Sequence, residues 1–444
     1  MCVLHSSTLC FHGFSRSFHQ LTICNSSNSS HNSTGLIPPL NQSVVALILG
    51  DGPESKLYPL TKRRSEAAIP IGARYRLIDI AISNCINSDI TKIYTLTQTN
   101  STSLNSHVSR AYSNIGVLGK EGFIDVLAAC QSLENHCWFK GNVDMVRKWL
   151  WLLEKHPATE FLILPGHHLY FMDYRELIKT HRDSEADITV SVSSTYQINS
   201  SSSSYGFLIL DNESRVLGFK EESSMDIGGR NMGIYVFKKN AMVKILKEYL
   251  PKANDFENEV IKGAISLGMK VQAHMFDGKW EDMNSIESFY HANMEINLIG
   301  QDFPIYTMPL CLPPTQISNA NISQSMIGDG CIINRCKISN SIIGMRTFIA
   351  DGAVIEDSFI MGRDFHHTDL KNQKELGSCT PIGIGEQTLI RKAIIDKNAC
   401  IGKNVQICNS NGVQECEREV EGYIISGGIV TVLKNAVIPD NSII

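Results

Sequence analysis

Short apolar runs alternate with stretches of helical character between residues 44 and about 298. An apolar run of four to eight residues bounded by turn residues is typical of a buried strand. The predicted strands are Val44–Leu49, Lys92–Thr97, Phe161–Leu164, Ile188–Ser193, Phe207–Leu210, Met232–Phe237 and Val271–Phe276. The predicted helices between them include Tyr75–Asn87, Asp144–Lys155, Tyr174–His181 and Ala241–Tyr249. This alternation predicts an α/β domain, residues 44–298, with helices on both faces of a mostly parallel sheet.

Two loops of this domain fall where α/β sheets bind ligands, beyond the carboxyl ends of strands. One is Gly50–Lys56, after the first strand, and the other is Leu164–Tyr174. A glycine-bearing loop after a strand often holds phosphate through its backbone N–H groups. The first loop also contains Asp51, Glu54 and Pro53, and proline has no N–H to donate. The pattern leaves open whether this loop still binds phosphate.

The periodicity changes after a linker that is punctuated by prolines, residues 299–320. Over residues 321–444, isoleucines recur every six positions, as in Ile343, Ile349, Ile355 and again in Ile395, Ile401, Ile407. Such hexads predict a β-helix of hexapeptide repeats, whose rungs stack and share one core. A β-sandwich with accidental spacing is the alternative. The segment GRDFHHTDLKNQKELGS interrupts the repeat and is predicted to be a loop extruded from the helix.

The first 43 residues differ in composition from the rest of the chain. Residues 1–40 contain no Asp or Glu, a single Arg, and much Ser, Asn and His. This composition cannot form a core, and organelle transit peptides are rich in Ser and poor in acidic residues. We therefore predict a transit peptide at residues 1–43, with a disordered tail as the alternative.

The whole chain has the composition of a globular protein, with 43% apolar and 19% charged residues. A net charge of −5 gives no reason to expect nucleic acid as a partner. No apolar run reaches the roughly 18 residues that predict a transmembrane helix. The 13 cysteines form no CxxC pair and no metal-ligand spacing. Cys331 and Cys336 lie in the repeat and are predicted to be packing residues rather than a disulfide.

Several longer motifs resemble one family. An α/β nucleotide-binding domain followed by a hexapeptide β-helix resembles the sugar-nucleotide pyrophosphorylases. The resemblance narrows to the small subunit of plant ADP-glucose pyrophosphorylase (glucose-1-phosphate adenylyltransferase) and extends over residues 44–444. The motifs that carry it are KLYPLTKRR, IGARYRLIDIAISNCINSDITKIYTLTQ, EGFIDVLAA, DYRELIKTHRDSEADITV, MGIYVF, DGKWED and PIGIGEQTLIRKAIIDKNACIG.

The resemblance implies a fold, a reaction and an assembly. The fold is a nucleotidyltransferase domain followed by a left-handed parallel β-helix. The reaction joins ATP and glucose 1-phosphate to give ADP-glucose and diphosphate, with Mg²⁺, as a step of starch biosynthesis. The resemblance also implies a chloroplast or other plastid location, and a heterotetramer of small and large subunits.

The first loop departs from the family pattern at charged positions. Gly50 and Gly52 match, but Asp51 and Glu54 stand where glycines are expected, and Lys56 stands for an arginine. Nucleotidyl transfer depends on positioning and on neutralising phosphate charge. A carboxylate beside a triphosphate adds repulsion, and lysine lacks the bidentate fork of arginine. The changes predict a loop that no longer holds phosphate well.

Further departures affect the expected phosphate and metal positions. Glu66 stands where the family has a lysine that supports the phosphates, and Phe171 replaces an arginine. His167 replaces an aspartate that helps to hold Mg²⁺, while Asp282 keeps the second metal carboxylate. Because Mg²⁺ prefers oxygen ligands, Asp282 alone is expected to hold it weakly.

The sugar-phosphate and base contacts implied by the resemblance are altered too. Glu222, after Glu221, stands where a lysine grips the phosphate of glucose 1-phosphate, and Cys130 replaces a glutamine that contacts the base. Since the changes fall on ligand positions while the scaffold motifs persist, we predict a catalytically inactive homologue. Its nucleotide-site remnants are Gly50, Gly52, Lys56 and Cys130, and its sugar-phosphate-site remnants are Glu221 and Gly233.

The resemblance also implies an effector site for phosphorylated metabolites in the β-helix. Lys397 and Lys434 match the family's effector lysines, and Arg391 and Lys392 are predicted to add cations nearby. The alternative is that these are ordinary solvated side chains.

Three hypotheses for the whole chain follow. The first is an inactive homologue that enters a tetramer with large or small subunits. The second is a divergent active enzyme, in which Lys56, Lys62, Arg64 or Lys220 supplies the missing cations. The third is a stand-alone module that binds sugar phosphates or effectors.

Overall fold

The computed structural model describes residues 39–50, 56–112, 116–119, 121–129, 139–194, 205–220, 229–296, 303–364 and 382–444. Most of the predicted transit peptide thus lies outside the described residues, and positions 39–43 carry the short helix α1 (Leu40–Ser43). The extruded loop predicted in the repeat also falls largely outside them. Within the described ranges, no helix is both long enough and apolar enough to span a bilayer.

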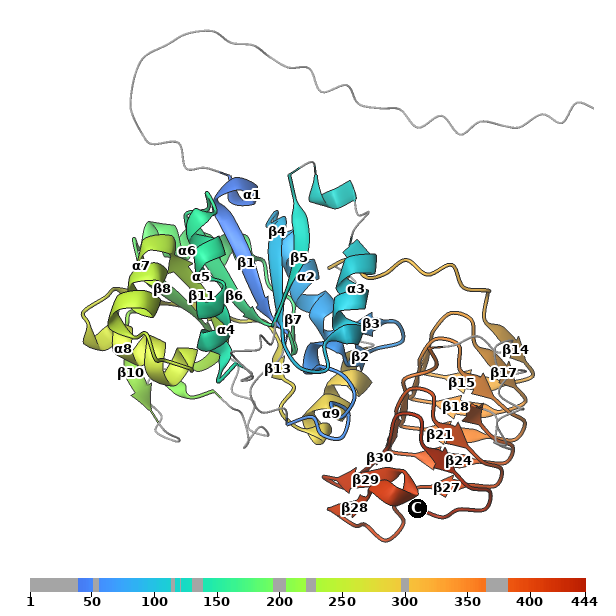
Figure 1. Ribbon diagram of the computed structural model, residues 1–444. Coiled ribbons are helices and arrows are strands. Elements are labelled where there is room, and N and C mark those ends of the chain that lie inside the picture. The colour runs from blue at the N-terminus through green and yellow to red at the C-terminus, as the bar shows by residue number, and fades with distance from the viewer. Residues whose placement is uncertain are drawn as a thin grey trace, which may run out of the picture. The chain divides into compact units, whose positions relative to one another are not determined.

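A mixed sheet forms the centre of the first domain (Figure 1). In the described part of the chain it has nine strands, with the order β10-β9-β11-β6-β1-β4-β5, and β8 joins β11 to β12. Neighbours β6, β1, β4 and β5 are parallel, as are β8 and β12, whereas β11 runs antiparallel to β6, β8 and β9. The strand bounds are β1 (Val44–Leu49), β4 (Lys92–Thr97), β5 (Phe123–Ala128), β6 (Glu160–Pro165), β8 (Ile188–Ser193), β9 (Phe207–Leu210), β10 (Val216–Lys220), β11 (Arg230–Lys238) and β12 (Val271–Phe276).

Helices cover both faces of this sheet (Figure 1). Along β1 the side chains alternate, because successive residues of a strand point to opposite faces. Val45 and Leu47 join a cluster with α4, α5, α7 and α8, while Ala46 and Ile48 join another with α2, α3 and α6. This two-sided burial explains the uninterrupted apolar run of β1. The helices are α2 (Leu77–Asn87), α3 (Thr102–Tyr112), α4 (Asn142–Lys148), α5 (Leu150–Lys155), α6 (Tyr174–Asp183), α7 (Lys239–Lys244), α8 (Lys262–Ser266) and α9 (Ile286–Glu295).

Two predicted helices differ in detail from the structure. The segment Asp144–Lys155 is divided at Trp149 into α4 and α5, and Ala241–Tyr249 continues from α7 into a π-helical turn, Ile245–Tyr249. A second π-helical segment is Phe256–Ile261, and a 3₁₀ turn, η1, is Glu66–Ala68. Small two-stranded sheets pair β2 (Pro70–Ile71) with β3 (Tyr75–Arg76), and β7 (His168–Tyr170) with β13 (Trp280–Asp282).

The C-terminal domain is a β-helix, as the hexads predict. Its rungs stack so that their strands form three sheets. The described strands of one sheet are β14 (Gln316–Ser318), β17 (Ile332–Asn334), β20 (Phe348–Ile349), β23 (Gly383–Ile384), β26 (Cys400–Ile401) and β31 (Val437–Ile438). Those of the second are β15 (Asn321–Ser323), β18 (Lys337–Ser339), β21 (Val354–Glu356), β24 (Leu389–Arg391) and β27 (Gln406–Ile407). Those of the third are β16 (Met326–Ile327), β19 (Ile342–Ile343), β22 (Phe359–Ile360), β25 (Ala393–Ile395), β30 (Ile429–Val432), β29 (Tyr423–Ser426) and β28 (Cys416–Arg418). The first strand begins at Gln316, inside the segment predicted as linker.

The core of the β-helix is a stack of isoleucines. Ile349 pairs with Ile333 on one side and with Ile384 on the other, and Ile401 pairs with Ile384 and Ile438. All five side chains are buried. The register is thus kept across residues 365–381, so the repeat resumes after its interruption.

Cysteine packing also agrees with the sequence analysis. Cys331 and Cys336 are buried and are not joined in a disulfide. Burial is the largest cause that raises the pKa of each thiol.

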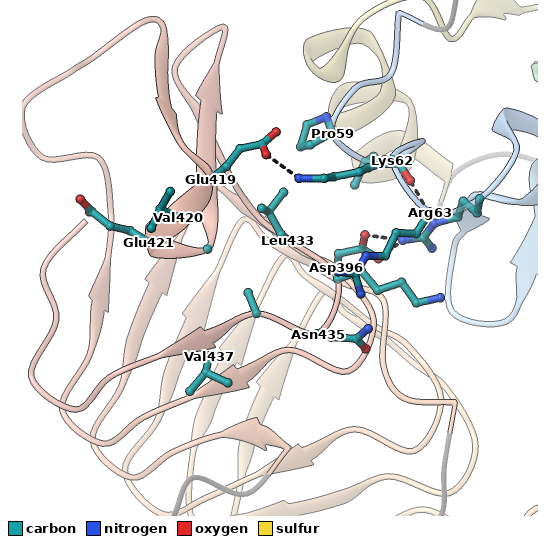
Figure 2. Close-up of a pocket in the computed structure, with 15 residues that line it drawn as sticks. Pro59, Lys62, Arg63, Asp396, Glu419, Val420, Glu421, Leu433, Asn435 and Val437 are labelled. Atoms are coloured by element: carbon teal, nitrogen blue, oxygen red, sulfur yellow. Dashed lines mark hydrogen bonds and ion pairs between the residues drawn. The ribbon is translucent and has the colours of Figure 1, made fainter. Parts of the chain in front are cut away.

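Residues 39–444 form one compact unit, and an apolar cluster joins the two domains. Helix α9 packs on β22, where the rings of Phe289 and Phe359 lie 5.9 Å apart. Beside this cluster, a cavity of about 360 Å³ lies between the segment 59–64 and the end of the β-helix. Figure 2 shows Lys62 paired with Glu419 at this cavity, with Asp396 nearby.

A buried ion pair between Arg64 and Asp396 links the domains. Both side chains are nearly inaccessible to water, with 3% and 2% exposed. The Arg64 Nε also donates to the Leu60 carbonyl at 3.0 Å. Removing one partner of a buried pair leaves an uncompensated charge, which typically costs about 3–5 kcal/mol.

We therefore expect Asp396→Asn to lower the free energy of unfolding by about 3–5 kcal/mol, measured by urea denaturation. Glu356→Gln is the control, because it removes a carboxylate whose partners Lys337 and Arg391 are both largely exposed. It should cost about 1 kcal/mol or less. Equal effects of the two variants would show that the Arg64–Asp396 pair does not stabilise the domain contact.

Candidate functional site

The two loops predicted to bind ligand begin at the same edge of the sheet. Strands β1 and β6 are parallel neighbours, with Leu49 opposite Pro165, so Gly50 and His167 follow at the same edge of the sheet. The N–H of Gly50 donates to the Leu96 carbonyl at 2.8 Å, and a Cβ at Gly50 would lie only 2.9 Å from that oxygen. Gly50 therefore serves close packing between strands, and its N–H is already used.

The described structure brings five predicted site residues to one cavity of about 310 Å³. They are Lys56, Glu66, His167, Gly233 and Asp282. Phe171 lies elsewhere and contacts Phe303, with a ring separation of 6.2 Å. Six predicted positions lie outside the described residues: Asp51, Gly52, Glu54, Cys130, Glu221 and Glu222.

The charge on the wall of this cavity is largely negative. Four carboxylates belong to its described lining. Among the described lining residues, Lys56 is the only lysine or arginine. The carboxylates are Glu66, Asp255, Glu257 and Asp282. Such a wall repels phosphate groups and favours cations.

The predicted metal position lies at the antiparallel pair of strands β7 and β13 and at the turn that precedes β7. Asp282 lies opposite His168 in the two-stranded sheet, and His167 precedes β7. Ligand atoms of His167, His168 and Asp282 all lie within 4.8 Å of one another. The Nε2 of His168 is 3.4 Å from Asp282 Oδ1.

His168 is held as a neutral ring. Trp280 Nε1 donates to its Nδ1 at 3.3 Å. Burial is the main cause that lowers the pKa of His168, to about 4. With two imidazoles beside one carboxylate, these groups do not fit Mg²⁺, which prefers oxygen ligands in octahedral geometry.

Glu66 and His167 face each other across the cavity wall. The Oε2 of Glu66, in η1, lies 3.8 Å from Nδ1 of His167, and the Glu66 side chain is buried. The resemblance implies a lysine and an aspartate at these two positions. The described structure therefore places an acidic side chain next to an imidazole at these two positions.

A group of polar residues in the cavity was missed by the sequence analysis. Glu257 is buried, accepts from the Gly206 N–H at 2.7 Å and accepts from Asn231 Nδ2 at 2.8 Å. Burial is the largest cause that raises the pKa of Glu257. Gly233 has φ +69°, and a Cβ there would lie 2.6 Å from the hydroxyl of Tyr205. Tyr205 thus fills the space beside a predicted sugar-phosphate remnant.

A second cavity, of about 220 Å³, contains both predicted effector lysines. Its ionisable lining residues are Arg64, Arg76, Arg110, Lys397, Lys434, His107 and Asp364. Lys397 Nζ lies 2.5 Å from Asp364 Oδ1, and Lys434 Nζ lies 3.7 Å from Oδ2. The cavity therefore gathers cations around one internal carboxylate.

Asp364 was not predicted at this cavity. Although burial by itself raises its pKa, Lys397 and Lys434 lower the pKa of Asp364 to about 2. Burial lowers the pKa of Lys397, whose side chain is only 15% exposed, so it is not an ordinary solvated lysine. Arg391 and Lys392 are not among the described lining residues of this cavity, and Arg391 pairs with Glu356 at 2.8 Å, so their role as nearby cations stays a prediction.

Comparison with known proteins agrees with this geometry. Residues 45–298 match the family described as nucleotidyl transferase, and residues 310–443 match the GLGC left-handed parallel beta-helix domain. The chain is 50% identical, over 94% of its length and 91% of the relative, to the inactive glucose-1-phosphate adenylyltransferase small subunit 2, chloroplastic, of Arabidopsis thaliana. It is 46% identical, over 94% of both chains, to the glucose-1-phosphate adenylyltransferase small subunit, chloroplastic/amyloplastic, of Triticum aestivum.

The chain belongs to the glucose-1-phosphate adenylyltransferase small-subunit family.

For a member of this adenylyltransferase family, the predicted fold class and the left-handed β-helix are confirmed. The names of both relatives also agree with the predicted plastid location. The roles that the resemblance implies for single positions, from Lys56 to Asp282 in the acidic cavity and for Lys397 and Lys434 in the cationic cavity, stay predictions. So does binding of Mg²⁺.

Proposed function

We propose that this chain is a small-subunit-type member of the ADP-glucose pyrophosphorylase family that does not catalyse the family reaction. The observation that carries the proposal is the acidic wall of the 310 Å³ cavity, where four carboxylates stand beside Lys56, the one lysine or arginine among the described lining residues. Catalysis of nucleotidyl transfer requires preorganised positive charge around the phosphates. One relative at 50% identity carries the word inactive in its name, which supports the same conclusion.

Loss of the metal position strengthens the proposal. Mg²⁺ normally bridges phosphate oxygens and is bound through carboxylates and water. With the His167 imidazole beside Asp282 and Glu66, and His168 next to them, the described donors are less suited to Mg²⁺ than an all-oxygen set. Each lost preorganised charge contact typically costs roughly 10²–10³ in rate.

The alternative of a divergent active enzyme needs other cations at the phosphates. The candidates Lys62 and Arg64 are paired with Glu419 and Asp396, respectively, and neither lines the acidic cavity. Lys220, at the end of β10, is not among the described lining residues either. Lys56 alone of the four is in place, which favours inactivity.

The family works as an assembly, and we assign this chain a structural or regulatory place in one. The partners would be large subunits of ADP-glucose pyrophosphorylase, small subunits, or both. Support comes from the intact isoleucine stack of the β-helix and from the cationic cavity. The test is an ADP-glucose synthesis assay of the purified chain, alone and co-expressed with an active large subunit, combined with size-exclusion chromatography. A monomer that ignores the large subunit would favour the stand-alone binding module.

The cationic cavity is the proposed effector site, with Lys397 and Lys434 as its anion ligands. Asp364 is an internal competitor there, because its carboxylate lies against both ammonium groups. A bound anion must displace or share these contacts.

Replacing Asp364 is expected to strengthen anion binding. For Asp364→Asn we expect inorganic phosphate to bind roughly tenfold more tightly, since one close charge interaction near a protein surface is worth on the order of 1–4 kcal/mol. Isothermal titration calorimetry measures this. Asp351→Asn is the control, because Asp351 pairs with the exposed Arg335 and does not line the cavity. An unchanged affinity in Asp364→Asn would refute the role of Asp364 as a competitor.

A further inference from the structure

The acidic cavity offers a chemistry that differs from the one implied by the family. We propose that it binds a divalent transition metal of the zinc class, through His167, Asp282 and Glu66. This site depends on the side chains of this chain and needs neither nucleotide nor sugar phosphate. The metal-site proposal can therefore be tested independently of the proposed loss of activity.

The first support is the nitrogen of His167. Its Nδ1 atom is buried and makes no hydrogen bond among the described residues. Glu66 Oε2 lies 3.8 Å away. An unpaired buried polar atom is costly, and a metal ion held between this nitrogen and the Glu66 carboxylate would satisfy the nitrogen.

The second support is the spacing of the groups. Zinc binds His nitrogen and carboxylate oxygen at about 2.0–2.2 Å in tetrahedral geometry, which puts neighbouring ligand atoms roughly 3.4 Å apart. The separation of 3.8 Å between His167 and Glu66 is a few tenths of an ångström longer than that. Ligand atoms of His167 and Asp282 belong to a cluster whose members all lie within 4.8 Å. Binding in this geometry requires the ligand atoms to approach one another by up to about 1.4 Å.

His168 has the position of an orienting residue. Because its Nδ1 accepts the indole N–H of Trp280, the proton of the neutral ring is on Nε2. That Nε2 is buried, makes no hydrogen bond in the described part of the chain, and faces Asp282 Oδ1 at 3.4 Å. A small movement of Asp282 toward a metal would let His168 donate to it. Second-sphere donors of this kind fix ligand orientation in metal sites.

The third support is the choice of metal. The wall of four carboxylates attracts a divalent cation electrostatically. A set that includes imidazole suits Zn²⁺ and its neighbours in the transition series, whereas Mg²⁺ takes oxygen ligands. His167 is thus the residue that decides between the two classes, because the remaining ligands are carboxylates.

The test measures metal binding to the full-length chain after removal of metals with a chelator. Zn²⁺ is titrated by calorimetry, and Co²⁺ serves as a spectroscopic probe with visible d–d bands. We expect the wild type to bind one equivalent of Zn²⁺. His167→Ala should bind it with roughly 100-fold lower affinity, since even second-sphere changes lower metal affinity 10–100-fold. Asp282→Asn and Glu66→Gln should weaken the same equivalent. His291→Ala, at an exposed position on α9, is the matched control and should bind as wild type.

A further variant tests the class of metal and not only its presence. His167→Asp converts the ligands to oxygen only, so the preference for Zn²⁺ over Mn²⁺ should fall by tenfold or more while a divalent ion is still bound. The proposal is overturned if wild type and His167→Ala bind Zn²⁺ with equal affinity and stoichiometry. It is also overturned if the Co²⁺ spectrum shows only thiolate charge-transfer bands that His167→Ala leaves unchanged, because the metal would then sit on cysteines. ADP-glucose formation with Mg²⁺ would contradict the proposed function alone.

Discussion

The purified chain, supplied with ATP, glucose 1-phosphate and Mg²⁺, will form ADP-glucose at least a thousandfold more slowly than an active small subunit. Several contacts are changed at once, and a single lost charge contact typically reduces the rate by roughly 10²–10³. The described cavity opposes the phosphates with Glu66, Asp255, Glu257 and Asp282. Radiolabelled product formation, alone and with a large subunit, measures the rate. Turnover within tenfold of the active subunit, with normal Mg²⁺ dependence, would show that the cavity works despite its charge.

Rescue should require several changes together. His167→Asp alone is expected to restore no activity, because it puts a new carboxylate beside Glu66, which lies 3.8 Å from the present imidazole. Two carboxylates this close repel, and one of them takes up a proton. Combining His167→Asp with Glu66→Lys and Glu222→Lys, and with glycine in place of Asp51 and Glu54, should give measurable synthesis.

A control for net charge accompanies the rescue. Glu386→Lys reverses an exposed acid of the β-helix that pairs with Lys403 and is not among the described residues of the cavity lining. It should leave the rate at background in the wild-type chain. If His167→Asp alone restored synthesis, the metal position would have been the single defect, and the argument from charge reversal would be wrong.

Ile401→Asp is expected to abolish folding of the β-helix and entry into any tetramer. Ile401 is 1% exposed and lies between Ile384 and Ile438 in the stack. The variant loses about 1.5–3 kcal/mol of burial and adds an unpaired buried carboxylate at several kcal/mol. The sum rivals the whole stability of a typical domain, about 5–15 kcal/mol.

Circular dichroism and size-exclusion chromatography of the chain co-expressed with a large subunit test this prediction. Ile349→Asp should behave in the same way, because Ile349 is stacked between Ile333 and Ile384. Gln406→Asp is the control, since Gln406 is exposed on β27. A folded, tetrameric Ile401→Asp chain would contradict the isoleucine stack as the source of stability.

The sequence predicted the elements whose side chains are buried in one regular pattern. β1 was placed to the residue because its side chains are buried on both faces, which makes the apolar run continuous. The hexad isoleucines were equally clear, since each rung repeats the same packing. The break at Trp149 was not predicted, because α4 and α5 share one continuous helical pattern. β5 was missed because FIDVLA mixes an aspartate with partly exposed positions.

The sequence was less informative about the site. That Glu66, His167 and Asp282 share one cavity could be expected through the family resemblance. The place of Glu257 could not, since its partners Gly206 and Asn231 are far from it in sequence and its own segment is rich in acids. Asp364 between Lys397 and Lys434 is likewise a product of tertiary folding, which brings three rungs' ends together.

The isoleucine stack of the β-helix is intact, whereas the described lining of the 310 Å³ cavity is mainly acidic. This contrast has a consequence for how the amount of this subunit affects ADP-glucose synthesis. Under the proposed function, a chain that folds and enters the tetramer, yet turns over no substrate, takes a subunit position away from a chain that does. Its abundance would then set the output of the mixed population by dilution. Raising its expression beside a constant amount of active small subunit would lower ADP-glucose synthesis per tetramer in proportion to the share of positions it fills.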